Sequence, residues 1–166
     1  MGAEVGARID RIAADLLAAS REPNLAEIVV ARAADALSGY GSCLGIVDEP
    51  TRTLRLRATH GFAREMAQAL RVAPLDSQQP ACVAARTGRP LVVSTFAEYV
   101  ALFPDFYAKY GATLRTRALV YAPVLHEGRS IGSLGVSFDH DRVANADDVA
   151  VLEALARFAS RALQRP

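Results

Sequence analysis

The last third of the chain holds the pattern that most constrains its fold. Residues 117–125 are apolar and strand-like, and residues 130–138 alternate small side chains with large ones. The tetrapeptide His-Glu-Gly-Arg at 126–129 separates them and predicts a hairpin turn, because glycine accepts a positive φ. Apolar residues at helical spacing then indicate a helix over 145–163. This strand–turn–strand–helix unit predicts paired antiparallel strands followed by a helix that packs on them.

The rest of the chain predicts shorter elements, most of them joined by tight turns. Asn24 followed by Glu27 indicates a helix that begins with a capping box. Residues 71–79 are polar and contain Pro74, which predicts a loop. Besides the last unit, the predicted helices are 5–19, 25–38, 62–70, 80–86, 96–102 and 104–110, and the predicted strands are 42–48, 53–60 and 91–93.

These elements favour one α+β domain spanning residues 1–166. Tight connections between neighbouring strands favour a central antiparallel sheet. The terminal helices, expected over 5–20 and 145–164, would cover one face of the sheet, and the middle helices the other. A chain of 166 residues is long enough to bury such a core without disulfides or metals.

Charge and hydropathy exclude several classes of partner. The net charge is +1, from 19 basic and 18 acidic residues, so no strong field attracts nucleic acid or a membrane surface. No apolar run reaches the roughly 18–20 residues of a membrane helix, and the N-terminus lacks a signal-peptide pattern. We therefore expect a cytoplasmic protein in which Cys43 and Cys82 are reduced thiols.

Three segments resemble the GAF family of sensory domains. Residues 118–138 are similar to that family's late hairpin, with a proline, a turn glycine and an Ile-Gly-x-Leu-Gly-Val-x-Phe strand. Residues 145–156 resemble its final helix, entered through an acidic pair. Residues 84–94 are similar to the helix–Gly–Pro–strand step of GAF domains from bacterial histidine kinases and PP2C-type phosphatases. The resemblance extends from about residue 8 to residue 163.

The resemblance implies a fold and a role. A GAF or PAS-like fold has a sheet of five or six antiparallel strands and a small-molecule pocket between the sheet and the middle helices. Its terminal helices pair in a homodimer and pass a signal to an output domain, such as a kinase of a two-component system or a phosphatase. We therefore expect a ligand-binding sensor in signal transduction rather than an enzyme, with no catalytic residues.

The ligand itself stays unidentified, because the motifs of known GAF ligands are absent. The chain lacks the Asn-Lys-x-x-x-Phe-x-x-x-Asp-Glu motif of the cyclic-nucleotide binders. Neither cysteine is followed by the histidine that is common where a bilin is attached. Two cysteines also do not complete the larger set of the GAF proteins that reduce free methionine sulfoxide. No cofactor is therefore assigned.

The candidate ligand-binding residues are mainly aromatic or basic. Tyrosine and phenylalanine concentrate in residues 96–110, where they suit a pocket lid or fill the core beneath a long connection. Two arginines follow, which could clamp an anion or remain solvated at a strand edge. A serine between two strand glycines leaves room for a ligand or for a packed helix. The candidates are Phe96, Tyr99, Phe103, Tyr107, Arg115, Arg117, Ser133 and, on the neighbouring helix, Cys82.

Cys82 also supports a second hypothesis, a thiol redox sensor or reductase. Its place near the start of helix 80–86 predicts a lowered thiol pKa and higher reactivity, whereas the alternative is a small buried residue. The three histidines, His60, His126 and His140, are far apart and have no metal-ligand spacing, so no metal site is expected.

A third hypothesis is a dimerisation module without a ligand. The terminal helices carry apolar residues away from their main stripes, at Leu17, Leu155 and Phe158. A helix that is apolar on more than one face usually has two partners. These residues therefore predict a homodimer through the terminal helices.

Overall fold

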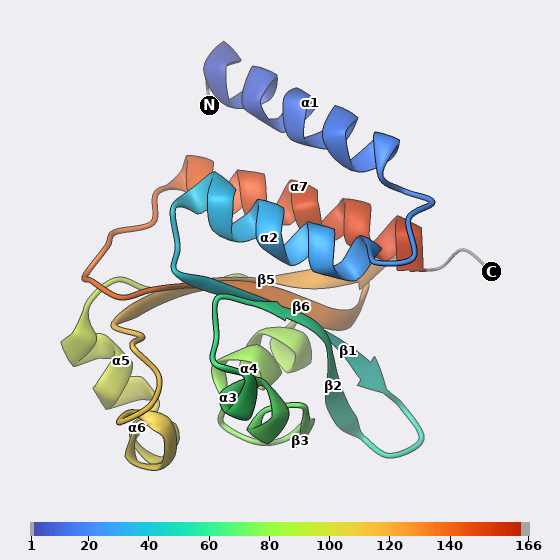
Figure 1. Cartoon of the computed structure of the whole chain (residues 1–166). Coiled ribbons are helices and arrows are strands. Elements are labelled where there is room, and N and C mark those ends of the chain that lie inside the picture. Colours follow the sequence, from blue (N-terminus) through green and yellow to red (C-terminus); the bar gives the residue numbers. More distant parts are fainter. Residues whose placement is uncertain (1, 164–166) are drawn as a thin grey trace.

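A six-stranded antiparallel sheet separates the helices into two layers (Figure 1). The structure is a computed structural model that describes residues 2–163. The strand order is β3-β2-β1-β6-β5-β4, so the late hairpin β5–β6 lies near the centre. The predicted α+β class and the helices on both faces of the sheet are confirmed, but the N-terminal helix Ala3–Ala18 lies on the C-terminal helix and not on the sheet itself. Residues 1 and 164–166 of the expected domain and final helix lie outside the described residues.

The strands and helices follow the predicted order, with the short strand β3 as the one addition. The strands are β1 Gly41–Asp48, β2 Thr53–His60, β3 Val72–Pro74, β4 Leu91–Val93, β5 Ala118–His126 and β6 Arg129–Phe138. The helices are α1 Ala3–Ala18, α2 Leu25–Leu37, α3 Arg64–Ala69, α4 Pro80–Thr87, α5 Phe96–Leu102, α6 Pro104–Tyr110 and α7 Ala146–Leu163.

The alternation along β6 assigns different residues to the two faces of the sheet. Its large side chains, Leu134, Val136 and Phe138, are buried in the core that α2 and α7 cover. Its small residues point to the opposite face, because successive side chains of a strand alternate. There Ser133 donates a hydrogen bond to the Ala81 carbonyl of α4 at 2.8 Å, so α4 approaches the sheet closely.

The outer layer consists of α2 and α7 on the sheet, with α1 lying across them on the side away from the sheet (Figure 1). The α1 side chains Ile9, Ile12 and Leu16 face Leu155 and Phe158 of α7 across a narrow apolar crevice. α1 therefore covers much of the apolar surface of α7 that the sheet leaves open. Leu17 of α1 remains 63% exposed.

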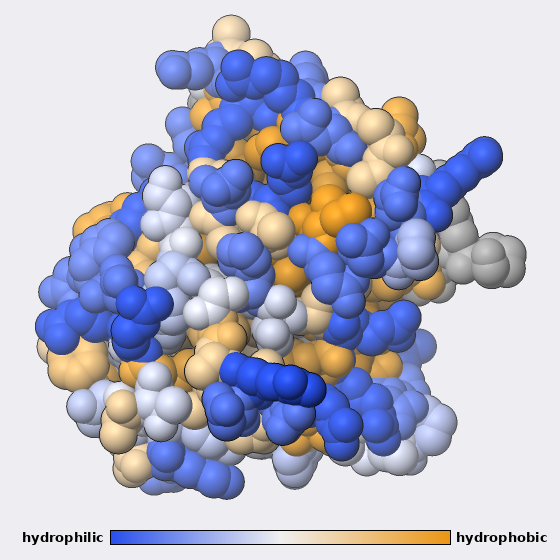
Figure 2. Space-filling model, in the orientation of Figure 1, coloured by the Kyte–Doolittle hydropathy of each residue, from blue (hydrophilic) through white to orange (hydrophobic). Residues whose placement is uncertain are grey.

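The surface between these elements is mixed in polarity. Figure 2 shows a mainly hydrophilic exterior, with hydrophobic surface in the seam between α1 and the helices beneath it. Within residues 2–163, every helix is too short or too polar to cross a bilayer.

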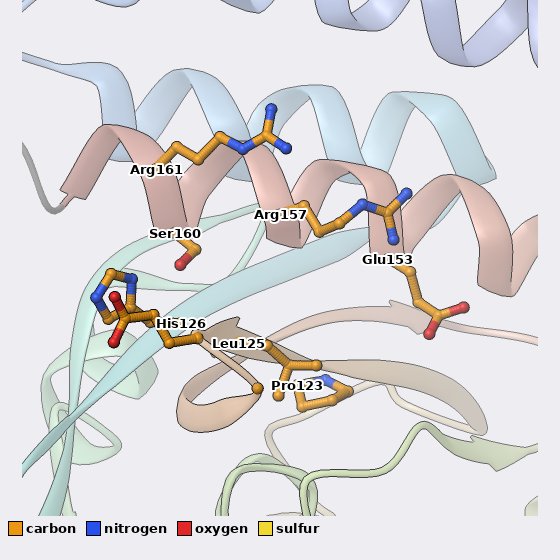
Figure 3. A pocket seen from close by; sticks show the side chains of 9 residues that line it. Pro123, Leu125, His126, Glu153, Arg157, Ser160 and Arg161 are labelled. Atoms are coloured by element: carbon orange, nitrogen blue, oxygen red, sulfur yellow. The ribbon is translucent and has the colours of Figure 1, made fainter.

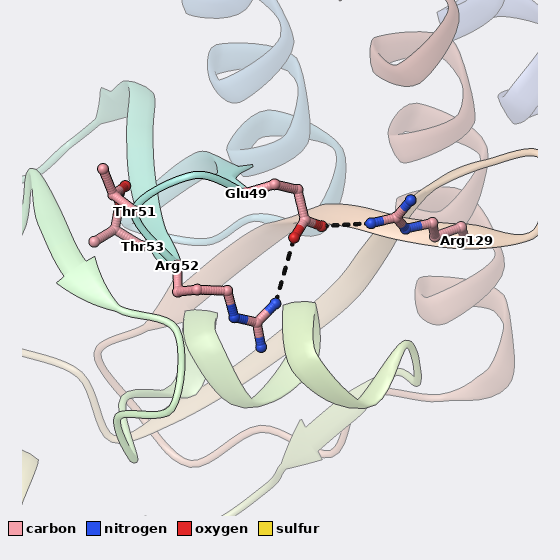
Figure 4. A network of polar contacts seen from close by, with 5 residues as sticks. All are labelled: Glu49, Thr51, Arg52, Thr53 and Arg129. Carbon is pink, nitrogen blue, oxygen red and sulfur yellow. Dashed lines mark hydrogen bonds and ion pairs between the residues drawn. The ribbon is translucent and has the colours of Figure 1, made fainter.

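Two hairpin turns are tied together by an exposed carboxylate. Glu127 and Gly128 form the two-residue turn of β5–β6, with φ values of 51° and 76°, as a type I′ turn requires. From the β1–β2 turn, Glu49 accepts from Arg129 at 2.7 Å and from Arg52 at 3.4 Å (Figure 4). Because these groups are exposed, the ion pairs contribute little stability, but they align the two turns.

Two local expectations are wrong. Residues 71–79 do not form a continuous loop, because Val72–Pro74 pairs with β2 as an edge strand. Pro74 is compatible with that position, since an outer edge needs no amide donor. The capping box at the start of α2 is also absent: Asn24 makes no side-chain cap and has ψ of 31° instead of the extended value of an N-cap.

Gly132→Ala is expected to destabilise the protein by about 2–3 kcal/mol. An added Cβ would lie 2.1 Å from the Gly45 carbonyl oxygen on β1, and paired backbone cannot move aside. The matched control is Gly6→Ala in α1, where nothing lies within 4 Å and helix propensity favours alanine. Urea unfolding of both variants checks this, and equal midpoints would show that β1 and β6 are not so tightly paired.

Candidate functional site

A partly open space lies between the inner face of the sheet and helices α3 to α6. It consists of two adjoining cavities of about 40 Å³ each. Both are lined by the same central residues, Cys43, Leu56, Leu70 and Tyr121, together with Pro80 and Phe106. The walls thus come from strands and helices far apart in sequence. Neither lining contains a charged side chain.

The floor of this space depends on one glycine in β6. Gly135 pairs with Cys43 on one side and with Tyr121 on the other. A Cβ at Gly135 would lie 2.1 Å from the Tyr121 ring, so the ring lies over the glycine. From there the Tyr121 hydroxyl reaches across β6 to the Cys43 sulfur at 3.4 Å. Gly135, Tyr121 and Cys43 lie on three adjacent strands and together form the floor of this space.

Further hydroxyl groups line the first of the two cavities. Tyr99 of α5 is 1% exposed and lines this cavity. Thr116, in the connection before β5, shares a hydrogen bond of 2.7 Å with Tyr40. Thr59 and Ser137 complete the polar part of the lining. The cavity is therefore mostly apolar with a few neutral hydroxyl groups.

Burial keeps the titratable groups of the cavity neutral. Desolvation raises the pKa of the Cys43 thiol to about 11 and raises the pKa of Tyr121 well above its ordinary value. The pKa of Tyr99 is raised for the same reason. Because no cationic group lines the cavity, an ionised thiol or phenol there would lack a counter-charge.

The structure brings the predicted aromatic residues together as one cluster. The Tyr107 ring lies 5.4 Å from Phe96 and 6.2 Å from Tyr99, and the Phe103 ring lies 6.3 Å from Tyr99. Of the four, Tyr99 lines the cavity, together with Phe106 from the same block. Phe96, Phe103 and Tyr107 pack around Tyr99, as the core interpretation expects, and the pocket-lid interpretation stays a prediction.

The two predicted arginines lie outside the cavity linings. Arg115 pairs with Asp139 and Arg117 with Asp141, each at 3.7 Å. Their guanidinium groups also lie over aromatic rings, Arg115 over Tyr40 and Arg117 over Phe96. Both side chains are solvated at the strand edge, and neither contributes to the lining of the two cavities.

Cys82 and Ser133 have packing partners in the structure. Cys82 is fully buried among Leu54, Ala73 and Leu75. Desolvation raises its pKa, so the prediction of a lowered thiol pKa is wrong: burial outweighs the helix terminus. Ser133 donates a hydrogen bond to α4, so this packed helix occupies the space beside the serine.

The sequence interpretation missed Cys43 and Tyr121 as site residues. The sequence predicts only a reduced thiol at Cys43, and Tyr121 is one position within the apolar segment 117–125. The available signal was the alternation of β6, which places small residues on the inner face opposite Tyr121. Gly135 lies between Tyr121 and Cys43 because of the strand register, which the sequence does not reveal.

The connection from β6 to α7 touches both the cavity wall and the outer layer. Asp141 accepts from the Phe96 amide at the start of α5 at 3.0 Å. Its neighbour Arg142 donates its amide to Ser94 at 2.9 Å and its guanidinium to both Asp148 oxygens at 3.3 Å. Asp148 lies in the first turn of α7. Adjacent residues therefore hold the first turns of α5 and α7.

A wider cleft of about 370 Å³ lies between the β5–β6 turn and α7. Its lining includes His126, Glu153, Arg157 and Arg161 (Figure 3). Figure 3 shows Arg161 extending away from His126, so the cationic groups do not converge. Because charges of both signs lie in open solvent there, their fields are screened, and the inner cavities are the stronger candidate site.

The described residues contain no group of three or more histidine, cysteine, aspartate or glutamate side chains suited to a metal ion. The candidate site therefore offers hydrogen bonding and apolar packing as its chemistry.

Comparison with known proteins supports one family. The family model described as GAF domain matches residues 19–164. Among curated proteins, none matches the chain.

Solved structures show the same fold at low identity. The GAF domain of a phosphoenolpyruvate-protein phosphotransferase from Coxiella burnetii is 17% identical with a TM-score of 0.79, covering 96% of this chain and 92% of that one. A putative two-component sensor histidine kinase domain from Sinorhizobium meliloti 1021 is 19% identical with a TM-score of 0.64, covering 87% and 92%. A free methionine-R-sulfoxide reductase from Neisseria meningitidis is 17% identical with a TM-score of 0.72, covering 94% and 86%.

The free energy of unfolding is expected to fall as the pH rises from 9 to 11. The Cys43 pKa is raised from 9.0 to about 11, so the folded state holds its proton more tightly. That stabilisation is complete below pH 9 and is lost as the pH rises through the folded pKa, at a cost of about 2–3 kcal/mol. Urea unfolding of the wild type and Cys43→Ala across this range measures the difference. Parallel pH curves would contradict the assigned burial of the thiol.

Proposed function

Because the chain belongs to the GAF domain family, we propose that it is a sensory domain of a signal-transduction protein that binds a small molecule between the sheet and helices α3 to α6. The observation that carries the proposal is the partly open, mostly apolar cavity lined by Tyr99 and Tyr121. Apolar space with a few hydroxyl groups is the usual chemistry of a small-molecule site. The domain would act by binding rather than by catalysis.

The inner layer is built to respond to an occupant. α6 has no fully buried residue, and its half-buried Phe106 lines both cavities. A segment with little buried apolar surface opens at low free-energy cost. We expect a ligand to order or displace α6 and the adjacent α5, since Phe106 of α6 and Tyr99 of α5 line the cavity.

The connection 139–145 offers a route from the cavity wall to the terminal helix. Asp141 holds the start of α5, and Arg142 holds the start of α7 through Asp148. Asn145 and Asp148 also cap each other at 2.9 and 3.1 Å, which fixes where α7 begins. A shift of α5 would therefore reach α7 through two neighbouring residues, without a change in the sheet.

The proposed output passes through the terminal helices to a kinase or phosphatase domain, in the same chain or in a partner. A homodimer through these helices is part of the proposal. Leu155 and Phe158 are already covered by α1 of the same chain, whereas Leu17 is exposed. The dimer contact would therefore involve the outer side of α1.

A dimerisation module without a ligand is the second candidate, and the small size of the cavities favours it. Each holds about 40 Å³, far below the several hundred Å³ of a typical drug-sized site. The thiol redox alternative has less support, because both thiols are buried and their pKa values are raised.

Ala67→Met is expected to abolish ligand binding while keeping the fold. Ala67 of α3 is half-buried and lines the first cavity, so a longer apolar side chain fills the space that a ligand needs. The control is Ala69→Met on the exposed side of the same helix. Native mass spectrometry after incubation with a small-molecule cell extract checks this. A dimer that carries no adduct in the wild type and control would favour the dimerisation module.

Asp141→Ala is expected to loosen both α5 and α7. Loss of the Phe96 hydrogen bond and the Arg117 ion pair removes roughly 1 kcal/mol, so amide exchange in α5 rises about fivefold. If the connection transmits the change, exchange in the first turn of α7 rises with it. Glu49→Ala, which breaks exposed pairs at the distant turns, is the control. Faster exchange in α5 alone would exclude this route.

A further inference from the structure

The cavity that is proposed to bind a ligand also defines the chemistry of that ligand. We propose that it accepts a compact, electrically neutral molecule with an apolar body and one hydroxyl or carbonyl group. This inference rests on the proposed function, since it concerns the same cavity. It follows from three properties of the lining: its charge, its hydroxyl groups and its volume.

The lining has nothing to neutralise an ion. Among residues 2–163, no Asp, Glu, Lys or Arg side chain faces either cavity. The nearby Arg115 and Arg117 are exposed and paired with Asp139 and Asp141 at the strand edge. An ion transferred from water into such a space loses its hydration without gaining a partner, which costs far more than transfer of a neutral group. The cavity therefore discriminates against carboxylates, phosphates and ammonium groups.

Two tyrosine hydroxyls provide the polar part of the recognition. The Tyr121 hydroxyl has a thiol as its partner, and sulfur is a weak hydrogen-bonding atom. Tyr99, whose side chain is 1% exposed, also lines the first cavity. Because sulfur is a weak partner, the Tyr121 hydroxyl gains when a ligand oxygen enters. A hydroxyl or carbonyl oxygen near the two rings meets this need.

The volume limits the size of the molecule. Each cavity of about 40 Å³ is far below the several hundred Å³ of a typical drug-sized site, so the ligand must be small. Side chains of Leu56, Leu70 and Phe106 border both cavities, so the two spaces adjoin. A molecule of only a few non-hydrogen atoms therefore suits this space.

The test uses three probes of one shape and different charge: isobutanol, isobutyrate and isobutylammonium at pH 7. Titrations followed by amide chemical shifts of the intact protein give each dissociation constant. Isobutanol is expected to bind at least about 30-fold more tightly than either ion, with shifts confined to the residues of the two cavities. Tyr121→Phe is expected to weaken isobutanol about fivefold, because one hydrogen bond is lost. Tyr110→Phe, which lines neither cavity, is the control.

The outcomes separate this inference from the function on which it rests. Binding of isobutyrate or isobutylammonium at the cavity as tightly as isobutanol would overturn the neutral class and leave a ligand-binding domain in place. Unchanged affinity in Tyr121→Phe would overturn the assigned hydroxyl contact, provided that the variant keeps the wild-type amide spectrum. Absence of cavity shifts with all three probes would count against both the ligand class and the sensory function.

Discussion

The two-sided packing of β6 is the constraint on which the rest of the structure depends. Its large residues attach α2 and α7 to the outer face, as Leu134 and Val136 show. Its small residues let α4 approach the inner face and let the Tyr121 ring lie over Gly135. A slip of one residue in β6 would exchange the two faces. The type I′ turn at Glu127-Gly128 holds the register that prevents this slip.

Elements with a strong hydrophobic periodicity or a characteristic turn sequence were predictable. Elements that form only by pairing with another strand were not. The hairpin at 126–129 and the helix α7 carry their signal in local sequence. β3 does not, because three residues of mixed polarity become a strand only by pairing with Thr53–Arg55. The capping box predicted from Asn24 is also absent: the side chain is suitable, but the backbone has a ψ of 31° instead of the extended value that a cap needs.

The candidate site was predictable in composition rather than in geometry. The aromatic block correctly indicated residues near the cavity, since Tyr99 lines it and Phe103 and Tyr107 support Tyr99. The two residues at its centre, Cys43 and Tyr121, meet only because their strands pair on either side of β6. Cys82 shows the opposite case, in which a reactive pattern in sequence is overruled by burial. Long-range pairing and burial are the properties that local sequence does not carry.

The position of α1 gives this helix the properties of a tethered ligand. A short connection through Pro23 joins α1 to α2. One stripe of α1, which includes Ile12 and Leu16, packs on α7. A short tether holds its end at an effective concentration of about millimolar. At micromolar protein, α1 therefore stays on its own chain. Near millimolar protein concentration, or beside a second copy held at a fixed distance, the α1 of another copy can replace this α1 on α7.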